Sequence, residues 1–151
     1  RFKIEEDGKH WALRLMKLRH SRKLWHFANV VTQCVLVAAH GKGPDNQVPT
    51  RLGAELQKAP LLRVVEGAHK LGRPGVCVPI FEAYERFLSL ISRPDVRGEL
   101  EGLRHDDRHG SKVFGELDQN AQKLQHGING MIDLLESVPA RKAYIRRYVL
   151  S

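Results

Sequence analysis

The segment FGELDQNAQKLQHGINGMIDLLESV, residues 114–138, decides the fold class of this chain. Its apolar residues recur at alternating steps of three and four, which is the heptad spacing of a helix that buries one narrow stripe. A helix with such a stripe packs against neighbouring helices in a bundle. The segment therefore predicts one long helix near the C-terminus, with a core-facing seam formed by Phe114, Leu117, Ala121, Leu124, Ile128, Met131, Leu135 and Val138.

Shorter helical patterns precede this segment. Residues 27–38 are apolar on nearly all sides, which fits a central buried helix, whereas residues 11–15 fit either a strand or a helix. We predict a helix for both. Three further patterns each follow a proline, the residue best suited to a first helical turn. They cover residues 61–71 after Pro60, 80–91 after Pro79 and 96–103 after Pro94.

The connections between these patterns give no sign of a sheet. Residues 40–46 predict a loop, and residues 72–75 and 108–111 predict turns. No two alternating apolar runs flank a tight Asn-Gly or Asp-Gly turn, which is the usual signal of a hairpin. We therefore predict an all-α, single-domain helical bundle of about five to seven helices.

The chain length sets the size of the core. A domain of 151 residues buries roughly two thirds of the surface that its unfolded chain exposes, and it leaves little room for a second core. The longest nearly uncharged apolar stretch, residues 27–39, is shorter than the about 20 residues that cross a bilayer, so no membrane partner is expected. Because the chain opens on Arg1 rather than Met, we expect residues 1–151 to be one domain of a larger protein or assembly.

The positive charge is concentrated at the two ends of the sequence. Lys and Arg number 25 against 17 Asp and Glu, which gives a net charge of +8. Residues 8–44 and 141–151 contain basic residues and no acidic one, whereas the segment between them is slightly acidic. Such clustering favours nucleic acid or an acidic protein surface as the partner. Solvated faces that keep a small domain in solution are the alternative.

The leading functional interpretation is a nucleic-acid-binding or nucleoprotein-assembly module that contacts the phosphate backbone of RNA or DNA. Near the C-terminus, Tyr144 and Tyr148 lie one helical turn apart among basic residues. Tyrosines in that setting either stack on bases or cover the edge of the core. The candidate phosphate contacts are Arg14, Lys17, Arg19, Arg22, Lys23, Arg141, Lys142, Arg146 and Arg147.

The densest polar cluster is Arg104-His105-Asp106-Asp107-Arg108-His109-Gly110. If its first residues are helical, His105 and His109 share a face and a carboxylate could complete a metal site. A solvated loop with local ion pairs is the simpler interpretation, and we predict no metal and no cofactor.

The same cluster resembles the short arginine-to-histidine motif of HEPN domains, all-α domains that often act as metal-independent ribonucleases. In that family the motif precedes a final long helix, as it does here. The resemblance implies that Arg104 meets the scissile phosphate, His109 transfers a proton and His105 supports them. RNA supplies its own 2′-hydroxyl nucleophile, so a cation and an imidazole suffice for this chemistry. A ribonuclease is therefore the alternative enzymatic function.

A second resemblance lies at Ala68-His69-Lys70-Leu71-Gly72, which is similar to the phosphorylatable-histidine motif of histidine-phosphotransfer domains. Those domains are also helical bundles. Here the lysine is missing from its place in the motif, and Pro74 ends the helix that those domains continue. A histidine at a helix end before a glycine cap is the alternative interpretation.

The sequence contains two cysteines. Cys34 and Cys77 lie in apolar surroundings without Cys-x-x-Cys spacing, so we expect reduced core thiols in an intracellular protein.

A third function class is a helical protein–protein interaction or scaffold domain. Its basic ends would meet an acidic protein, and its seam would form a homodimer or part of a larger complex.

Overall fold

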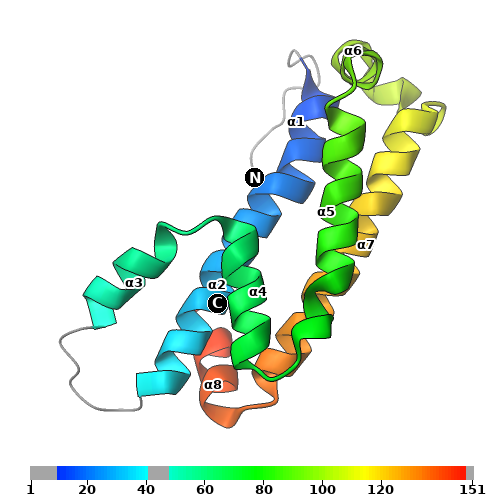
Figure 1. The fold of residues 1–151 in the computed structure, drawn as a ribbon. Helices are drawn as coiled ribbons and strands as arrows, with labels where there is room; N and C mark the ends of the chain where they lie inside the picture. Colours follow the sequence, from blue (N-terminus) through cyan, green and yellow to red (C-terminus); the bar gives the residue numbers. More distant parts are fainter. Residues whose placement is uncertain (1–9, 41–47, 149–151) are drawn as a thin grey trace. The chain divides into compact units, whose positions relative to one another are not determined.

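A computed structural model describes residues 10–40 and 48–148, and these residues form helices and turns without any strand (Figure 1). Because α1, the π-turn η1 and α2 follow one another without a break, the described residues make seven helices. The predicted all-α architecture is confirmed. The elements are α1 (Trp11–Lys17), η1 (Leu18–Arg22), α2 (Lys23–His40), α3 (Val48–Leu56), α4 (Pro60–Lys70), η2 (Pro74–Cys77), α5 (Val78–Ile91), α6 (Pro94–Gly102), η3 (His105–His109), α7 (Lys112–Glu136) and α8 (Pro139–Tyr148).

Prolines and one glycine set several helix ends as the sequence predicts. Helices α4, α6 and α8 begin at Pro60, Pro94 and Pro139, where a missing N–H costs nothing. Gly72 has a φ of 70°, the left-handed conformation that closes α4. Its N–H donates to the His69 carbonyl oxygen at 2.9 Å. The long helix α7 runs without interruption, and its seam is buried from Phe114 to Leu135.

The segment between α2 and α4 contains a helix, α3, that the sequence pattern does not predict. The predicted loop at residues 40–46 lies outside the described residues, except for His40 at the end of α2. Helix α3 is not anticipated by the apolar spacing. Among its described side chains only Leu52 and Glu55 are half-buried, so it lacks the apolar stripe that marks the other helices.

The contacts divide the chain into two compact units. Unit 1 is built from Arg1–Lys23 and Pro79–Gln125, and unit 2 from Leu24–Val78 and His126–Ser151. Each unit thus combines two separate segments of chain. The prediction of a single domain over residues 1–151 stays a prediction.

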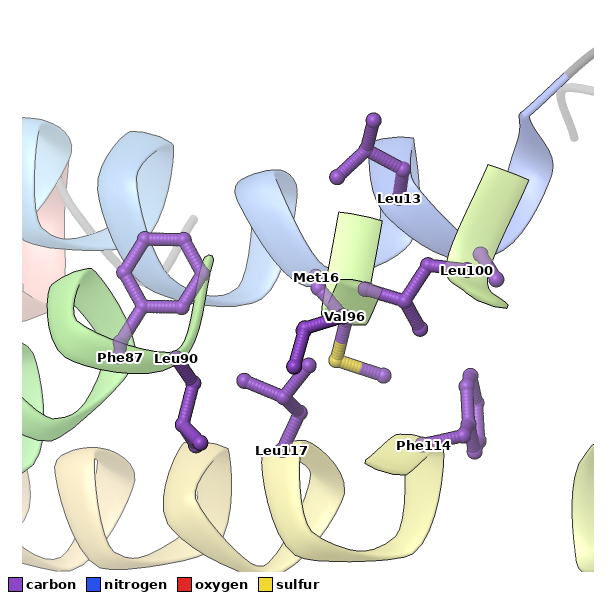
Figure 2. Packing of buried hydrophobic residues seen from close by; sticks show 9 residues of the cluster. Leu13, Met16, Phe87, Leu90, Val96, Leu100, Phe114 and Leu117 are labelled. Atoms are coloured by element: carbon purple, nitrogen blue, oxygen red, sulfur yellow. The ribbon is translucent and has the colours of Figure 1, made fainter. Parts of the chain in front are cut away.

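The core of unit 1 joins four helices, α1, α5, α6 and α7. Figure 2 shows Met16 of α1 and Leu117 of α7 near the middle of this cluster, and both side chains are fully buried. Apolar burial of this kind contributes roughly 25 cal/mol per Å² and is the main stabilising force of such a bundle. The buried residues are Ala12, Leu13, Met16, Phe87, Leu90, Val96, Leu100, Phe114 and Leu117.

Unit 2 contains a close approach between α2 and α4. A Cβ atom placed on Gly67 would collide with Cγ1 of Val31 and would lie 3.4 Å from Cε of Met131. Gly67 therefore permits a helix spacing that a larger residue would prevent.

Cys34 is also buried in unit 2, and burial raises the pKa of its thiol to about 11. Both cysteines are free and buried.

None of the helices in the described ranges has the length and apolar character that spanning a membrane requires.

Candidate functional site

Unit 1 contains a pocket of about 650 Å³, a size within the usual range of small-molecule sites. Three parts of the unit form it: the α1–η1 helix, the 3₁₀ turn η3 and the first half of α7. Its wall mixes cationic, imidazole, aromatic and amide side chains. The lining residues are Trp11, Leu15, Arg19, His105, Arg108, His109, Ser111, Phe114, Gly115, Asp118, Gln119 and Gln122.

The turn η3 brings two imidazoles onto one guanidinium. Arg108 Nε donates to His109 Nε2 at 3.1 Å, and Arg108 Nη1 donates to His105 Nε2 at 2.5 Å. In both contacts the guanidinium is the donor and the imidazole Nε2 is the acceptor. A guanidinium carries five N–H groups, and these two contacts use two of them. The remaining N–H groups are available to a ligand.

Arg108 is half-buried and has no carboxylate partner among the described residues. The two acids of the same turn lie elsewhere. The Asp106 side chain is 95% exposed, with one carboxylate oxygen 3.8 Å from His105 Nδ1, and Asp107 is exposed. Neither aspartate lines the pocket. The pocket lining therefore includes the guanidinium of this turn and neither of its two carboxylates.

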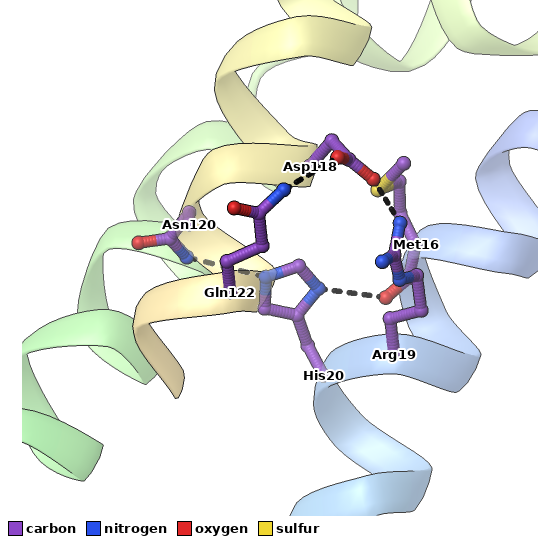
Figure 3. A network of polar contacts seen from close by, with 6 residues as sticks. All are labelled: Met16, Arg19, His20, Asp118, Asn120 and Gln122. Atoms are coloured by element: carbon purple, nitrogen blue, oxygen red, sulfur yellow. Dashed lines mark hydrogen bonds and ion pairs between the residues drawn. The ribbon is translucent and has the colours of Figure 1, made fainter. Parts of the chain in front are cut away.

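The pocket lining also includes a neutralised pair (Figure 3). Arg19 of η1 forms an ion pair with Asp118 of α7. Gln122 Nε2 donates to the other Asp118 oxygen at 3.1 Å. Because Arg19 and Asp118 cancel, the formal charge of the pocket lining comes from Arg108.

Aromatic rings form the apolar part of the wall. Trp11 packs against His105 and Phe114, with ring centroids 5.1 and 5.5 Å apart. The indole Nε1 donates to the Leu103 carbonyl oxygen at 2.7 Å. This bond ties α1 to the segment that leads into η3. Trp11 therefore links the aromatic wall to the turn that carries the histidines.

The π-turn η1 positions Arg19 by turning its neighbour His20 inward. In η1 the Lys23 N–H reaches back to the Leu18 carbonyl oxygen, five residues earlier, which is the wide turn of a π-helix. His20 is fully buried, and its Nδ1 lies 2.8 Å from the Met16 carbonyl oxygen (Figure 3). Burial lowers the pKa of His20, and the charges of Arg19 and Lys23 add to this effect.

Asn120 completes the buried network from α7. Its Nδ2 donates to His20 Nε2 at 3.2 Å and to the Ala83 carbonyl oxygen at 2.7 Å. Since His20 Nε2 accepts, its Nδ1 carries the proton and donates to the Met16 carbonyl oxygen. The His20 ring also stacks on Phe87, with centroids 4.2 Å apart and an interplanar angle of 6°. The polar network thus fixes the helix that carries Arg19.

The basic residues predicted near the N-terminus separate into two groups. Arg14, Lys17 and Arg22 are exposed and form no ion pair with a described residue. Arg19 is paired with Asp118, and Lys23 donates to Gln125 Oε1 at 2.8 Å. Burial and the nearby Arg19 lower the pKa of Lys23.

The basic residues predicted near the C-terminus belong to unit 2. Arg141 and Lys142 are half-buried, and Arg141 Nε is buried without a partner in the described residues. Arg146 and Arg147 lie in α8, but their side chains are outside the described set, as are those of Tyr144 and Tyr148.

The three residues of the ribonuclease hypothesis are only partly brought together. His105 and His109 both line the pocket. Arg104 precedes η3, is exposed and does not line the pocket. The residue that joins the two histidines is Arg108, which the sequence interpretation left without a role. Its position between two histidines of one short turn is the signal that could have identified it.

The two other motif-based ideas have simple structural settings. His69 is exposed in the last turn of α4, and the helix ends at Lys70. The part of the chain that is described brings no three metal-ligating side chains into one cluster. His105 and His109 instead accept hydrogen bonds from Arg108.

No protein-family model, curated protein or solved structure matches this chain.

Proposed function

We propose that this protein is a nucleic-acid-binding module that contacts phosphate groups through unit 1. The observation that carries the proposal is the arrangement on the α1–η1 helix. Arg14, Lys17 and Arg22 extend into solvent without ion pairs to described residues, and the same helix supplies Arg19 to the pocket. Free cationic side chains on one element, next to a pocket with an unneutralised guanidinium, suit a chain of phosphates.

The physical basis of this binding is the release of counterions from the nucleic acid. Each phosphate that a Lys or Arg neutralises releases condensed cations, so affinity falls as salt rises. The three exposed residues are able to make such contacts without first breaking an internal ion pair. Arg19 and Lys23 would have to leave Asp118 and Gln125, so they contribute less.

The proposal is tested by fluorescence anisotropy with labelled single-stranded and double-stranded oligonucleotides of RNA and DNA. The double variant Arg14→Gln/Lys17→Gln removes two exposed charges, and its affinity is expected to fall about tenfold, on the order of the loss of two phosphate contacts. The matched control Arg97→Gln/Lys123→Gln removes one Arg and one Lys that are exposed elsewhere in unit 1. Equal losses in the two variants would contradict a contact surface on the α1–η1 helix.

A second candidate function, a metal-independent ribonuclease, is favoured by one specific observation. Two imidazoles of η3 contact the same guanidinium, so an acid, a base and a cation are held within one turn. In this version Arg108 takes the phosphate-binding role that the sequence motif assigned to Arg104.

The reaction needs only these groups and the RNA itself. One imidazole takes the proton of the 2′-hydroxyl as the 2′-oxygen forms a bond to phosphorus. The bond from phosphorus to the 5′-oxygen breaks, and the other imidazole, which enters this step in its protonated form, gives that oxygen a proton. The products are a 2′,3′-cyclic phosphate and a 5′-hydroxyl. Arg108 would stabilise the negative charge that develops on the phosphoryl oxygens.

Cleavage of varied RNAs in the presence of EDTA tests this candidate. Activity is expected to fall about 10²–10⁴-fold in His109→Ala and His105→Ala, as when a general acid or base is lost. Arg108→Ala should impair cleavage, whereas Arg104→Ala should leave most of it. Absence of cleavage by the intact protein would remove the candidate and leave binding as the function.

A further inference from the structure

We propose that the unit 1 pocket binds a phosphorylated strand end, with the terminal phosphate on Arg108, His105 and His109 and the terminal nucleoside against the aromatic wall. The inference rests on the proposed function, since it names which part of a nucleic acid enters the pocket. It goes beyond that function because backbone contacts by Arg14, Lys17 and Arg22 need no strand end.

The donors of η3 match the requirements of a phosphate monoester. Arg108 keeps three N–H groups after its contacts with the two imidazoles, which is enough for a bidentate contact. Each imidazole accepts from Arg108 at Nε2, so its other ring nitrogen, Nδ1, is the one that is able to donate to the anion. A terminal phosphate offers three oxygens and a charge of about −1.5 to −2 at neutral pH. The guanidinium and the two imidazoles of the turn thus offer their donors to one such group, and its two aspartates do not line the pocket.

An internal phosphodiester fits this arrangement less well. It carries a single negative charge, and two of its oxygens are bonded to carbon. Arg108 contacts both imidazoles of η3, so the N–H groups of these three side chains lie in one turn, and a phosphate with three free oxygens uses more of them. The Arg19–Asp118 pair, which also lines the pocket, adds no net charge for a second phosphate.

The rest of the pocket suits a nucleoside. Trp11 and Phe114 provide an apolar surface for a sugar or base. Gln119 lines the same pocket and is exposed, so its amide is able to contact the polar edge of a base. A volume of about 650 Å³ lies within the range of small-molecule pockets and accommodates one nucleotide.

The test compares three versions of one DNA oligonucleotide, which lacks the 2′-hydroxyl and so resists the cleavage described above. They carry a 5′-phosphate, a 3′-phosphate or hydroxyls at both ends. Affinities are measured by anisotropy at constant ionic strength. At least one phosphorylated version is expected to bind about tenfold more tightly than the hydroxyl version, and the better of the two identifies the end. Arg108→Ala is expected to remove this preference, so that all three versions bind this variant equally.

Arg97→Ala is the matched control, because it removes an exposed arginine of unit 1 that does not line the pocket. It should keep the preference for the phosphate. Circular dichroism melting confirms that each variant is folded. Equal binding of all three versions by the wild-type protein would overturn the inference and leave the proposed function intact. No binding of any version or of the corresponding RNAs would overturn the proposed function itself.

Discussion

At the scale of single residues, His20 connects the buried core of unit 1 to the candidate site. Its ring lies between Phe87 and the Asn120 amide, and its Nδ1 bonds to the Met16 carbonyl oxygen. A buried group with all of its hydrogen bonds satisfied holds a defined geometry, whereas a change in its charge disrupts that geometry. His20 is therefore a residue through which pH affects the stability of unit 1.

The pH dependence of stability follows from the pKa of His20. Burial is the main cause that lowers this pKa below its ordinary value of 6.5, and Arg19 and Lys23 lower it further. Above pH 6.5 both states hold His20 neutral. Below it the unfolded state binds the extra proton, so the free energy of unfolding falls as pH decreases from 6.5 toward the folded-state pKa. Urea unfolding between pH 5 and 7.5 measures this loss.

The control separates His20 from the other ionisable groups of the chain. His20→Gln should show a smaller decrease in stability over this pH range than the wild type. His26→Gln alters an exposed histidine and should keep the wild-type decrease. If His20→Gln and the wild type lose stability in parallel, His20 is not the group responsible.

At the scale of elements, the apolar spacing predicted the helices well but not the irregular turn η1. The seam of α7 is buried from Phe114 to Leu135, as its heptad pattern requires. Val138 lies beyond the helix end at Glu136 and is half-buried. Pro139 explains this end, because a residue before proline is disfavoured in helical conformation.

The π-turn explains why the basic residues of the N-terminal helix could not be assigned to faces. Winding the sequence at 3.6 residues per turn gives no clean basic face. The wider turn of η1 places Arg19 on the pocket while Arg22 remains exposed. The stacking of His20 on Phe87 and its bond to Asn120 favour this turn, and both partners are distant in the sequence. Local spacing therefore could not reveal it.

Gly67 gives a prediction about helix packing in unit 2. Alanine is favoured over glycine by about 1 kcal/mol within a helix, yet a Cβ here would collide with Val31. We expect Gly67→Ala to destabilise the protein by about 1–3 kcal/mol, the usual cost of overpacking. Gly130→Ala is the matched control, since its Cβ would meet open space, and it should stabilise the protein. Chemical denaturation measures both, and a stabilised Gly67→Ala would contradict the close approach.

At the scale of the whole molecule, the sequence predicted the fold class more completely than the site. Helix spacing and prolines are local signals, so they identified most helices and the long α7. The pocket depends on contacts between distant segments, such as Trp11 with Leu103 and Arg19 with Asp118. The sequence identified His105 and His109 through their motif. It could not show that Arg108 holds both while Arg104 lies outside the pocket.

The net charge of the chain is +8, and the structure shows which basic side chains near the N-terminus have internal partners and which extend into solvent. Of the five basic residues predicted to contact phosphate near the N-terminus, Arg19 and Lys23 have internal partners and the other three extend into solvent. The side chains of the α7 seam are buried from Phe114 to Leu135. The exposed residues Arg14, Lys17 and Arg22 of the α1–η1 helix are therefore the feature that best supports the proposed binding to a polyanion.

The salt dependence of nucleic-acid binding tests this account most directly. For single strands, the slope of the logarithm of the association constant against the logarithm of salt concentration is about −0.7 for each phosphate contact. Arg14→Gln/Lys17→Gln should therefore make the slope less steep by about 1.4 compared with the wild type. A wild-type protein that binds with no salt dependence, or an unchanged slope in this variant, would contradict the account.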